Sequence, residues 1–231
     1  MKRSEINAVM RSAESFIRQR GFYLPPFAYW TAEDWGTRGL EAREIVENHL
    51  GWDITDFGSG EFDRRGLFLF TVRNGHPENW KHLQGKLYAE KLMIVGEKQV
   101  TPMHFHWTKM EDIINRGGGV LAIQLYNASP DDQLDRTGPV TASKDGVQAV
   151  YPAGTTLRLE PGASITLVPR CYHQFWGEGG RVLVGEVSLV NDDFTDNRFL
   201  EPVGRFPDIE EDEPPLHLLC TDYERYYHPA S

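Results

Sequence analysis

The stretch Met-His-Phe-His-Trp-Thr-Lys-Met-Glu at residues 103–111 decides the fold and most of the chemistry that can be predicted for this chain. His104 and His106 alternate with bulky apolar residues, and side chains two positions apart on a β-strand point to the same face. A bend or a bulge after the pair would bring Glu111 to the same point. Two imidazoles and a carboxylate suit a divalent transition metal, so the stretch predicts a metal site carried by a strand.

A fourth ligand is expected from a second strand-like run, VPRCYHQFW at residues 168–176, in which His173 is the candidate. An HxH pair alone is weak evidence, because such pairs are common in proteins that bind no metal. Here the pair is followed by Glu111, by the glycine run at residues 117–119 and later by Pro-x-x-x-His. The combination favours a metal site over an ordinary pair of strand histidines.

The spacing HxH-x4-E-x6-G resembles the first cupin motif, with His104, His106, Glu111 and Gly118 at the matching positions. The second cupin motif, G-x5-PxG-xx-H-xxx-N, is matched only in part. Its first glycine and its proline stand one residue farther apart here, and Gly177 takes the place of the asparagine. The first motif is therefore strong and the second is degenerate.

Over its whole length the chain resembles the D-lyxose isomerase family of cupin sugar isomerases. The stretches that carry this resemblance are TPMHFHWTKMEDIINRGGG, VPRCYHQFWG, LYAEKLMIVGEKQV and VSLVNDDFTDNRF. The resemblance implies a jelly-roll barrel with manganese as the metal. It also implies interconversion of D-lyxose with D-xylulose, and of D-mannose with D-fructose as a slower reaction.

Composition and charge argue against several classes of protein. The chain has 231 residues, 40% of them hydrophobic, which is enough for one large β domain with extensions. A net charge of −10 argues against binding to nucleic acid or to an anionic membrane. Cys171 and Cys220 are too few for a disulfide framework, and neither a signal peptide nor a membrane-spanning run is visible. We expect a cytoplasmic protein, and we also expect a homodimer that acts on a small sugar.

The hydrophobic pattern predicts a mainly β fold in one structural domain: a cupin double-stranded β-helix with an N-terminal helical extension. Residues 1–65 are expected to form a helical arm, with amphipathic helices at 4–20, which Ser4 would cap, and at 38–50, which Gly51 would end. Residues 66–200 are expected to form the barrel with the metal site. Residues 201–231 are expected to form an acidic, solvated loop and a closing segment.

Short runs of β-branched and aromatic residues between Gly and Pro turns are typical of a jelly roll. Residues 75–79 are expected as a turn and residues 128–146 as a long polar loop. The strands are expected at residues 67–73, 87–95, 120–126, 147–151, 155–159, 164–168 and 182–190.

The predicted ligand set suits aldose–ketose isomerisation. Three neutral imidazoles and one carboxylate leave a divalent ion with positive charge, and a six-coordinate ion would keep two positions for neighbouring sugar oxygens. Such an ion polarises a carbonyl and lowers the pKa of the adjacent hydroxyl. A proton then moves between C1 and C2 through an enediol, with help from a positioned acid or base. A hydride shift is the alternative, and the sequence leaves both open.

The acid or base must project into the same barrel. Lys109 lies between two predicted ligands and is expected at the mouth of the barrel, with a solvated turn residue as the alternative. Lys91 and Glu90 are neighbours on an apolar strand, so one of them points inward, and the resemblance favours Lys91. Asp192, which follows the last long strand, is the third catalytic candidate.

Gln99, Glu186 and Asp193 are candidates for binding sugar hydroxyls, because each stands in or beside a predicted barrel strand. The remaining histidines have no ligand-like spacing and are expected to be ordinary loop or surface residues; they are His49, His76, His82, His217 and His228.

The same ligands also fit other functions. A cupin-type metal-dependent oxygenase or decarboxylase, and a sugar-binding cupin without activity, both stay open, because a fold does not choose a reaction. The ligand types admit Mn2+, Fe2+, Co2+, Ni2+ and Zn2+. Neither cysteine stands at a ligand position, which argues against structural zinc.

Overall fold

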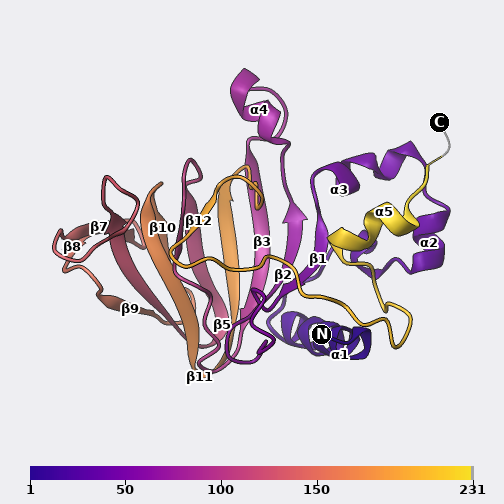
Figure 1. Ribbon diagram of the computed structural model, residues 1–231, viewed down its shortest axis with the longest axis horizontal. Helices are drawn as coiled ribbons and strands as arrows, with labels where there is room; N and C mark the ends of the chain where they lie inside the picture. The colour runs from indigo at the N-terminus through magenta and orange to yellow at the C-terminus, as the bar shows by residue number, and fades with distance from the viewer. Residues whose placement is uncertain (230–231) are drawn as a thin grey trace.

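The computed structural model describes residues 1–229, and its centre is a sheet of twelve antiparallel strands. The α-helices other than α4 are gathered at one end of the sheet (Figure 1). The central order of the sheet is β1-β2-β3-β11-β5-β10-β7-β8. The strands are β1 (Gly51–Thr55), β2 (Leu67–Arg73), β3 (Tyr88–Val95), β4 (His104–His106), β5 (Glu111–Ala128), β6 (Leu134–Asp135), β7 (Val140–Lys144), β8 (Val147–Tyr151), β9 (Thr156–Leu159), β10 (Ser164–Leu167), β11 (Cys171–Leu189) and β12 (Asn197–Phe199).

The helices are short except for the first one. No helix within residues 1–229 is long and apolar enough to cross a membrane. The α-helices are α1 (Arg3–Gln19), α2 (Ala32–Gly36), α3 (Arg43–Glu47), α4 (Pro77–His82) and α5 (Tyr223–Tyr226), and the 3-10 helices are η1 (Pro26–Tyr29), η2 (Leu40–Ala42) and η3 (Cys220–Asp222).

The two longest strands, β5 and β11, pair with each other along nearly their whole length and bend together. Their register shifts between Glu178 and Val182, opposite the glycine run. Gly118 has a φ of 113°, a conformation that side chains with a Cβ rarely adopt, and a Cβ there would lie 2.2 Å from the Arg181 carbonyl oxygen. Gly118, the glycine of the first motif, therefore allows β5 and β11 to bend, so that each strand contributes to two parts of the sheet.

Hydrophobic side chains form two main clusters, one on each side of strands β2 and β3. Helix α1 lays Ile6, Met10 and Phe16 against Phe68 and Phe70 of β2, as its predicted amphipathic pattern requires. The second cluster fills the space between the strands that carry the site; its members include Leu69, Met93, Ile113, Leu121, Ile123, Ile165 and Val184. Strand β2 is buried on both faces because it separates the two clusters.

The region predicted as a helical arm also contains a strand. The helix expected at 38–50 is wrong in extent, since only η2 and α3 form there. Gly51 begins β1 rather than ending a helix, and β1 pairs with β2 at the edge of the sheet. The strand was missed because it is short and contains Asp53, whose burial depends on a distant arginine. The division of the chain into arm, barrel and closing segment stays a proposal.

Two segments predicted as irregular contain regular structure. The polar loop expected at 128–146 carries β6 and β7. Strand β6 has only two residues, and the apolar alternation of β7 is limited to Val140 and Ala142, which is too short to mark a strand. The turn expected at 75–79 includes the start of α4, with Pro77 at the position where its missing N–H costs nothing. The expected strands at 120–126 and 182–190 are the distal halves of β5 and β11, which both start earlier.

The acidic segment is largely exposed, as predicted, but it also ties the tail to the first helix. Arg3 pairs with Glu211 at 2.7 Å and with Asp222 at 2.9 Å, and its side chain is only 1% exposed. Ser4, which was expected to cap α1, instead donates its hydroxyl to Asp212 at 2.7 Å. Glu211, Asp212 and Glu213 thus have partners on α1 and hold the tail against this helix.

Replacing Arg3 with alanine is expected to destabilise the fold by about 3–5 kcal/mol, because the largely buried carboxylate of Asp222 then has lost its cation. The free energy of unfolding in urea measures the effect. Arg43→Ala is the matched control, since Arg43 pairs with Glu47 on the surface at side-chain exposures of 63% and 50%. The control is expected to cost less than about 1 kcal/mol. Equal losses in the two variants would contradict the burial argument.

Candidate metal and substrate site

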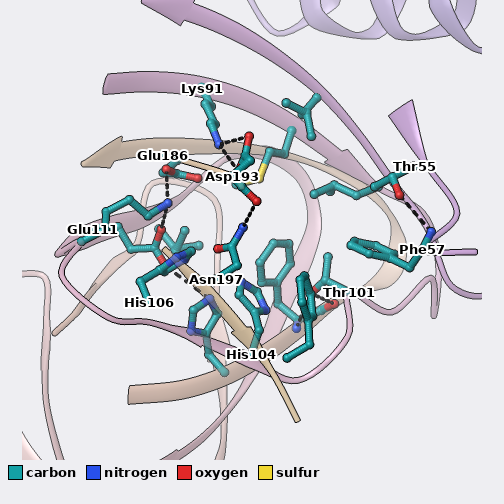
Figure 2. A pocket seen from close by; sticks show the side chains of 18 of the residues that line it. Thr55, Phe57, Lys91, Thr101, His104, His106, Glu111, Glu186, Asp193 and Asn197 are labelled. Carbon is teal, nitrogen blue, oxygen red and sulfur yellow. Dashed lines mark hydrogen bonds and ion pairs between the residues drawn. The ribbon is translucent and has the colours of Figure 1, made fainter. Parts of the chain in front are cut away.

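The predicted metal ligands lie together inside the barrel. Strand β4 places His104 directly opposite His173 of β11, and the two ring centroids are 4.2 Å apart. His106 is on the same face of β4, and the ligand atoms of the three histidines all lie within 4.8 Å of one another. Glu111 Oε1 is 3.3 Å from His106 Nε2 and 3.2 Å from His173 Nε2. Figure 2 shows the labelled ligands converging on one point.

Hydrogen bonds fix the orientation of two of the imidazoles. His104 Nδ1 lies 2.8 Å from the Pro102 carbonyl oxygen, and His173 Nδ1 lies 3.1 Å from the Cys171 carbonyl oxygen. Both Nδ1 atoms must therefore carry the proton, which leaves the Nε2 lone pairs directed toward the centre. Glu111 Oε1 is buried there and has no hydrogen-bond partner among the described residues. A buried carboxylate oxygen facing lone pairs is unfavourable unless a cation lies between them, so these residues fit a divalent metal ion.

The charge states of these groups suit metal binding. Burial lowers the pKa of His104 well below its ordinary value and lowers the pKa of His173 to about 4, so both rings are neutral at neutral pH. Burial alone would raise the pKa of Glu111, but the positive charge of Lys109 outweighs this effect. The pKa of Glu111 therefore lies well below its usual range, and the carboxylate is ionised.

Lys109 was predicted at the mouth of the barrel, and this prediction is wrong. The residue is buried beside the predicted ligands. Its Nζ lies 2.8 Å from both Glu111 and Glu186 and 3.2 Å from Asn191 Oδ1, and its side chain is 2% exposed. Burial opposes its charge, but the two carboxylates raise its pKa above the ordinary value. The alternative of a solvated turn residue is thus excluded, and Lys109 keeps a positive charge next to the ligand set.

A second group of charges lies beside the Lys109–Glu186 pair, because Lys91 of β3 is the register partner of Glu186 on β11. Lys91 points inward while Glu90 pairs with Arg73 on the other face, as strand alternation predicted. Lys91 Nζ lies 3.3 Å from Asp193 (Figure 2). Arg205 bridges Asp193 and the buried Asp53. Opposite charges therefore alternate along this wall, and the pKa of Asp193 is held below its usual range despite burial, chiefly by Lys91.

Neither Arg205 nor the apolar part of the cavity was predicted from the sequence. Arg205 is a single basic residue in an irregular segment, and no local pattern marks it. The apolar wall comes from different strands and loops, and its residues include Phe57, Leu67, Leu69, Met93, Ile113, Phe175 and Phe199. The cavity thus has a charged side near the ligands and an apolar side opposite.

Two predicted residues do not line this cavity. Asp192 accepts hydrogen bonds from the backbone N–H groups of Phe194 and Thr195, at 2.9 and 3.0 Å, and closes a turn. Gln99 accepts from the Gly96 N–H and donates to the Phe62 carbonyl. The predictions of Asp192 as a catalytic residue and of Gln99 as a sugar ligand are therefore corrected. Glu186 and Asp193, by contrast, both reach the cavity.

Comparison with known proteins identifies the family. A family model described as D-lyxose isomerase matches residues 1–223. The chain belongs to the D-lyxose isomerase family. The D-lyxose/D-mannose isomerase of Serratia proteamaculans is 50% identical over 229 residues, which cover 98% of this chain and 99% of the relative. That of Escherichia coli O157:H7 is 47% identical over 229 residues, covering 98% and 100%. The resemblance inferred from the motifs is confirmed.

Solved structures of other sugar isomerases share the fold of this D-lyxose isomerase family member. The L-ribose isomerase of Cellulomonas parahominis aligns with a TM-score of 0.59 at 17% identity, over 91% of this chain and 98% of that one. The L-ribose isomerase of Geodermatophilus obscurus aligns with a TM-score of 0.55 at 16% identity, over 86% and 92%. These alignments confirm the predicted mainly β cupin fold.

Proposed function

We propose that this chain is a metal-dependent aldose–ketose isomerase that interconverts D-lyxose and D-xylulose, with D-mannose and D-fructose as a second pair. Family membership supports the reaction class, and the names of the two bacterial relatives support the sugars. The observation that carries the proposal is that Lys109 Nζ lies 2.8 Å from both the predicted ligand Glu111 and a second carboxylate, Glu186. A cation and a carboxylate beside an ion site are the groups that an enediol mechanism requires.

Each group has a separate role in this proposal. His104, His106, Glu111 and His173 would hold one divalent ion. When bound, the ion supplies Lewis acidity, which polarises the sugar carbonyl and makes the neighbouring hydroxyl more acidic. The ammonium of Lys109 stabilises negative charge on the sugar oxygens as the enediolate forms.

The proton between C1 and C2 needs a carrier, and Glu186 is the carboxylate best placed for it. Glu111 is a predicted ligand, while Asp193 is held by Lys91 and Arg205. Glu186 faces the cavity beside Lys109 and accepts a hydrogen bond from Ser188 at 3.1 Å. On the neighbouring strand β3, Lys91 pairs with Asp193, and this pair is placed to bind other hydroxyls of the sugar.

We further propose Mn2+ as the ion, although Co2+, Fe2+, Ni2+ and Zn2+ suit the same nitrogen and oxygen donors. The homodimer and the cytoplasmic location expected from the sequence stay predictions, and light scattering of the purified protein tests the first. The oxygenase, decarboxylase and inactive sugar-binding alternatives are not favoured by the family relation.

Removal of the metal is expected to abolish turnover reversibly. The assay incubates the metal-loaded protein without oxygen with a panel of free pentoses and hexoses and follows aldose–ketose interconversion. EDTA treatment should stop it and Mn2+ should restore it, because the reaction depends on the ion's Lewis acidity. Mn2+ at a hundredfold excess over its Kd should also stabilise the fold by about 2.7 kcal/mol. A strict need for oxygen, or sugar binding without turnover, would support the other functions instead.

A further inference from the structure

Asp196 lies outside the cavity, between β11 and β12, where its carboxylate is hydrogen-bonded to the turn that joins two predicted ligands. Oδ1 accepts from the Thr108 N–H and the Thr108 hydroxyl, both at 2.8 Å. Oδ2 accepts from the Lys109 N–H at 3.0 Å. The Asp196 carbonyl oxygen accepts from the Trp107 N–H at 3.1 Å. One residue thus binds three consecutive backbone N–H groups of the turn.

We propose that Asp196 is a positioning residue, which fixes the turn at residues 107–109 and thereby holds the Lys109 ammonium between Glu111 and Glu186. This inference rests on the proposed function, because it concerns the geometry of the same site. The turn leaves β4 at His106 and must deliver Lys109 and Glu111 into the barrel within five residues. Asp196 is 8% exposed, so its carboxylate acts with little competition from water.

The position of Asp196 is itself fixed by strand pairing. The next residue, Asn197, pairs with His106, and Phe199 pairs with His104, so β12 lies in register along the ligand strand. The Phe199 ring centroid is 5.3 Å from that of His104. Asp196 therefore has a fixed position relative to the predicted ligands, which a residue that positions the turn must have.

Both carboxylate oxygens are needed for this arrangement, and Asp196→Asn is the sharpest test. An asparagine side chain has one acceptor oxygen, so its NH2 group must face an N–H donor of the turn in either orientation. In the proposed isomerisation, the kcat of Asp196→Asn is expected to fall about 10–100-fold, as it does when other residues that orient the groups of a site are replaced. The KM for the sugar is expected to change by less than about threefold, since Asp196 touches no substrate group.

The matched control is Asp135→Asn. Asp135 also accepts from the N–H and hydroxyl of a threonine, Thr137, and from the N–H of the next residue, Gly138, but it does so through Oδ1 alone and in the turn between β6 and β7. Its variant should keep the wild-type kcat. A kcat of Asp196→Asn equal to that of the control would overturn the proposal.

A double-mutant cycle separates positioning of Lys109 from general loosening of the fold. If Asp196 acts through Lys109, the variant Asp196→Asn/Lys109→Met has the same kcat as Lys109→Met alone. Independent losses that multiply would contradict the inference. Should Asp196→Asn fail to fold, Thr108→Val deletes one of the hydrogen bonds with little change of shape. It is expected to lower kcat severalfold with the same non-additivity, and a wild-type kcat in Thr108→Val would count against the inference.

Metal binding distinguishes failure of this inference from failure of the proposed function. If the wild-type protein turns over no sugar, the proposed function fails, and the electron paramagnetic resonance spectrum of bound Mn2+ becomes the readout. A shifted turn changes the placement of Glu111, so Asp196→Asn should alter this spectrum while Asp135→Asn leaves it unchanged. Identical spectra for both variants would overturn the positioning role.

Discussion

His104→Ala is expected to lose both metal and isomerase activity while keeping its fold. His104 lies opposite His173 across two paired strands, and its Nδ1 bond to a backbone carbonyl commits Nε2 to the ion. Alanine removes one of the four predicted ligands, and one of the two imidazoles that a hydrogen bond to a backbone carbonyl orients. Loss of the ion's Lewis acidity removes several kcal/mol of charge stabilisation, a decrease in kcat of about 10³-fold or more.

Elemental analysis and kcat, measured on the same sample, test this prediction. His82→Ala is the matched control, because His82 is an exposed residue at the end of α4 and does not line the cavity. It should retain full metal content and activity. A His104→Ala protein that keeps stoichiometric metal and near-normal turnover would remove His104 from the ligand set.

Lys109→Met is expected to separate metal binding from catalysis. Methionine keeps much of the length of the side chain and removes the ammonium, which has donors but no acceptor and is no ligand while protonated. The Glu111 carboxylate then loses a competing cation, so metal content should be retained. Without a positive charge to stabilise the enediolate, kcat should fall about 10²–10⁴-fold.

Lys81→Met serves as its control, because Lys81 is 66% exposed on α4 and pairs only with Glu78. The control should match wild type in kcat, metal content and stability. If Lys109→Met turned over sugar at the wild-type rate with its metal bound, charge stabilisation would have to come from Lys91 instead.

The ligand set could be predicted from sequence because its information is local. Two histidines at strand spacing, a glutamate after a short turn and a glycine that permits a bend lie within residues 104–118. His173 was identified as well, because it ends a second recognisable run. The inward direction of Lys91 followed from strand alternation together with the family resemblance.

The other parts of the site depend on pairings between distant segments and could not be predicted. Arg205 reaches the cavity only because Asp53 and Asp193 hold it there. Burial of Lys109 requires Glu186 from another strand, which local sequence does not show. In the same way, choosing Asp193 over Asp192 depends on the path of an irregular segment, for which hydrophobic periodicity gives no information.

The pairing of His104 with His173 has a consequence for folding kinetics. These predicted ligands are far apart in the sequence, and we expect β4 and β11 to meet only after the long strands β5 and β11 have paired. Contacts of this kind form late, because the entropy of closing a long loop must be overcome first. The ion therefore finds no complete site in the transition state for folding. Saturating Mn2+ is expected to slow unfolding in stopped-flow experiments and to leave the refolding rate nearly unchanged.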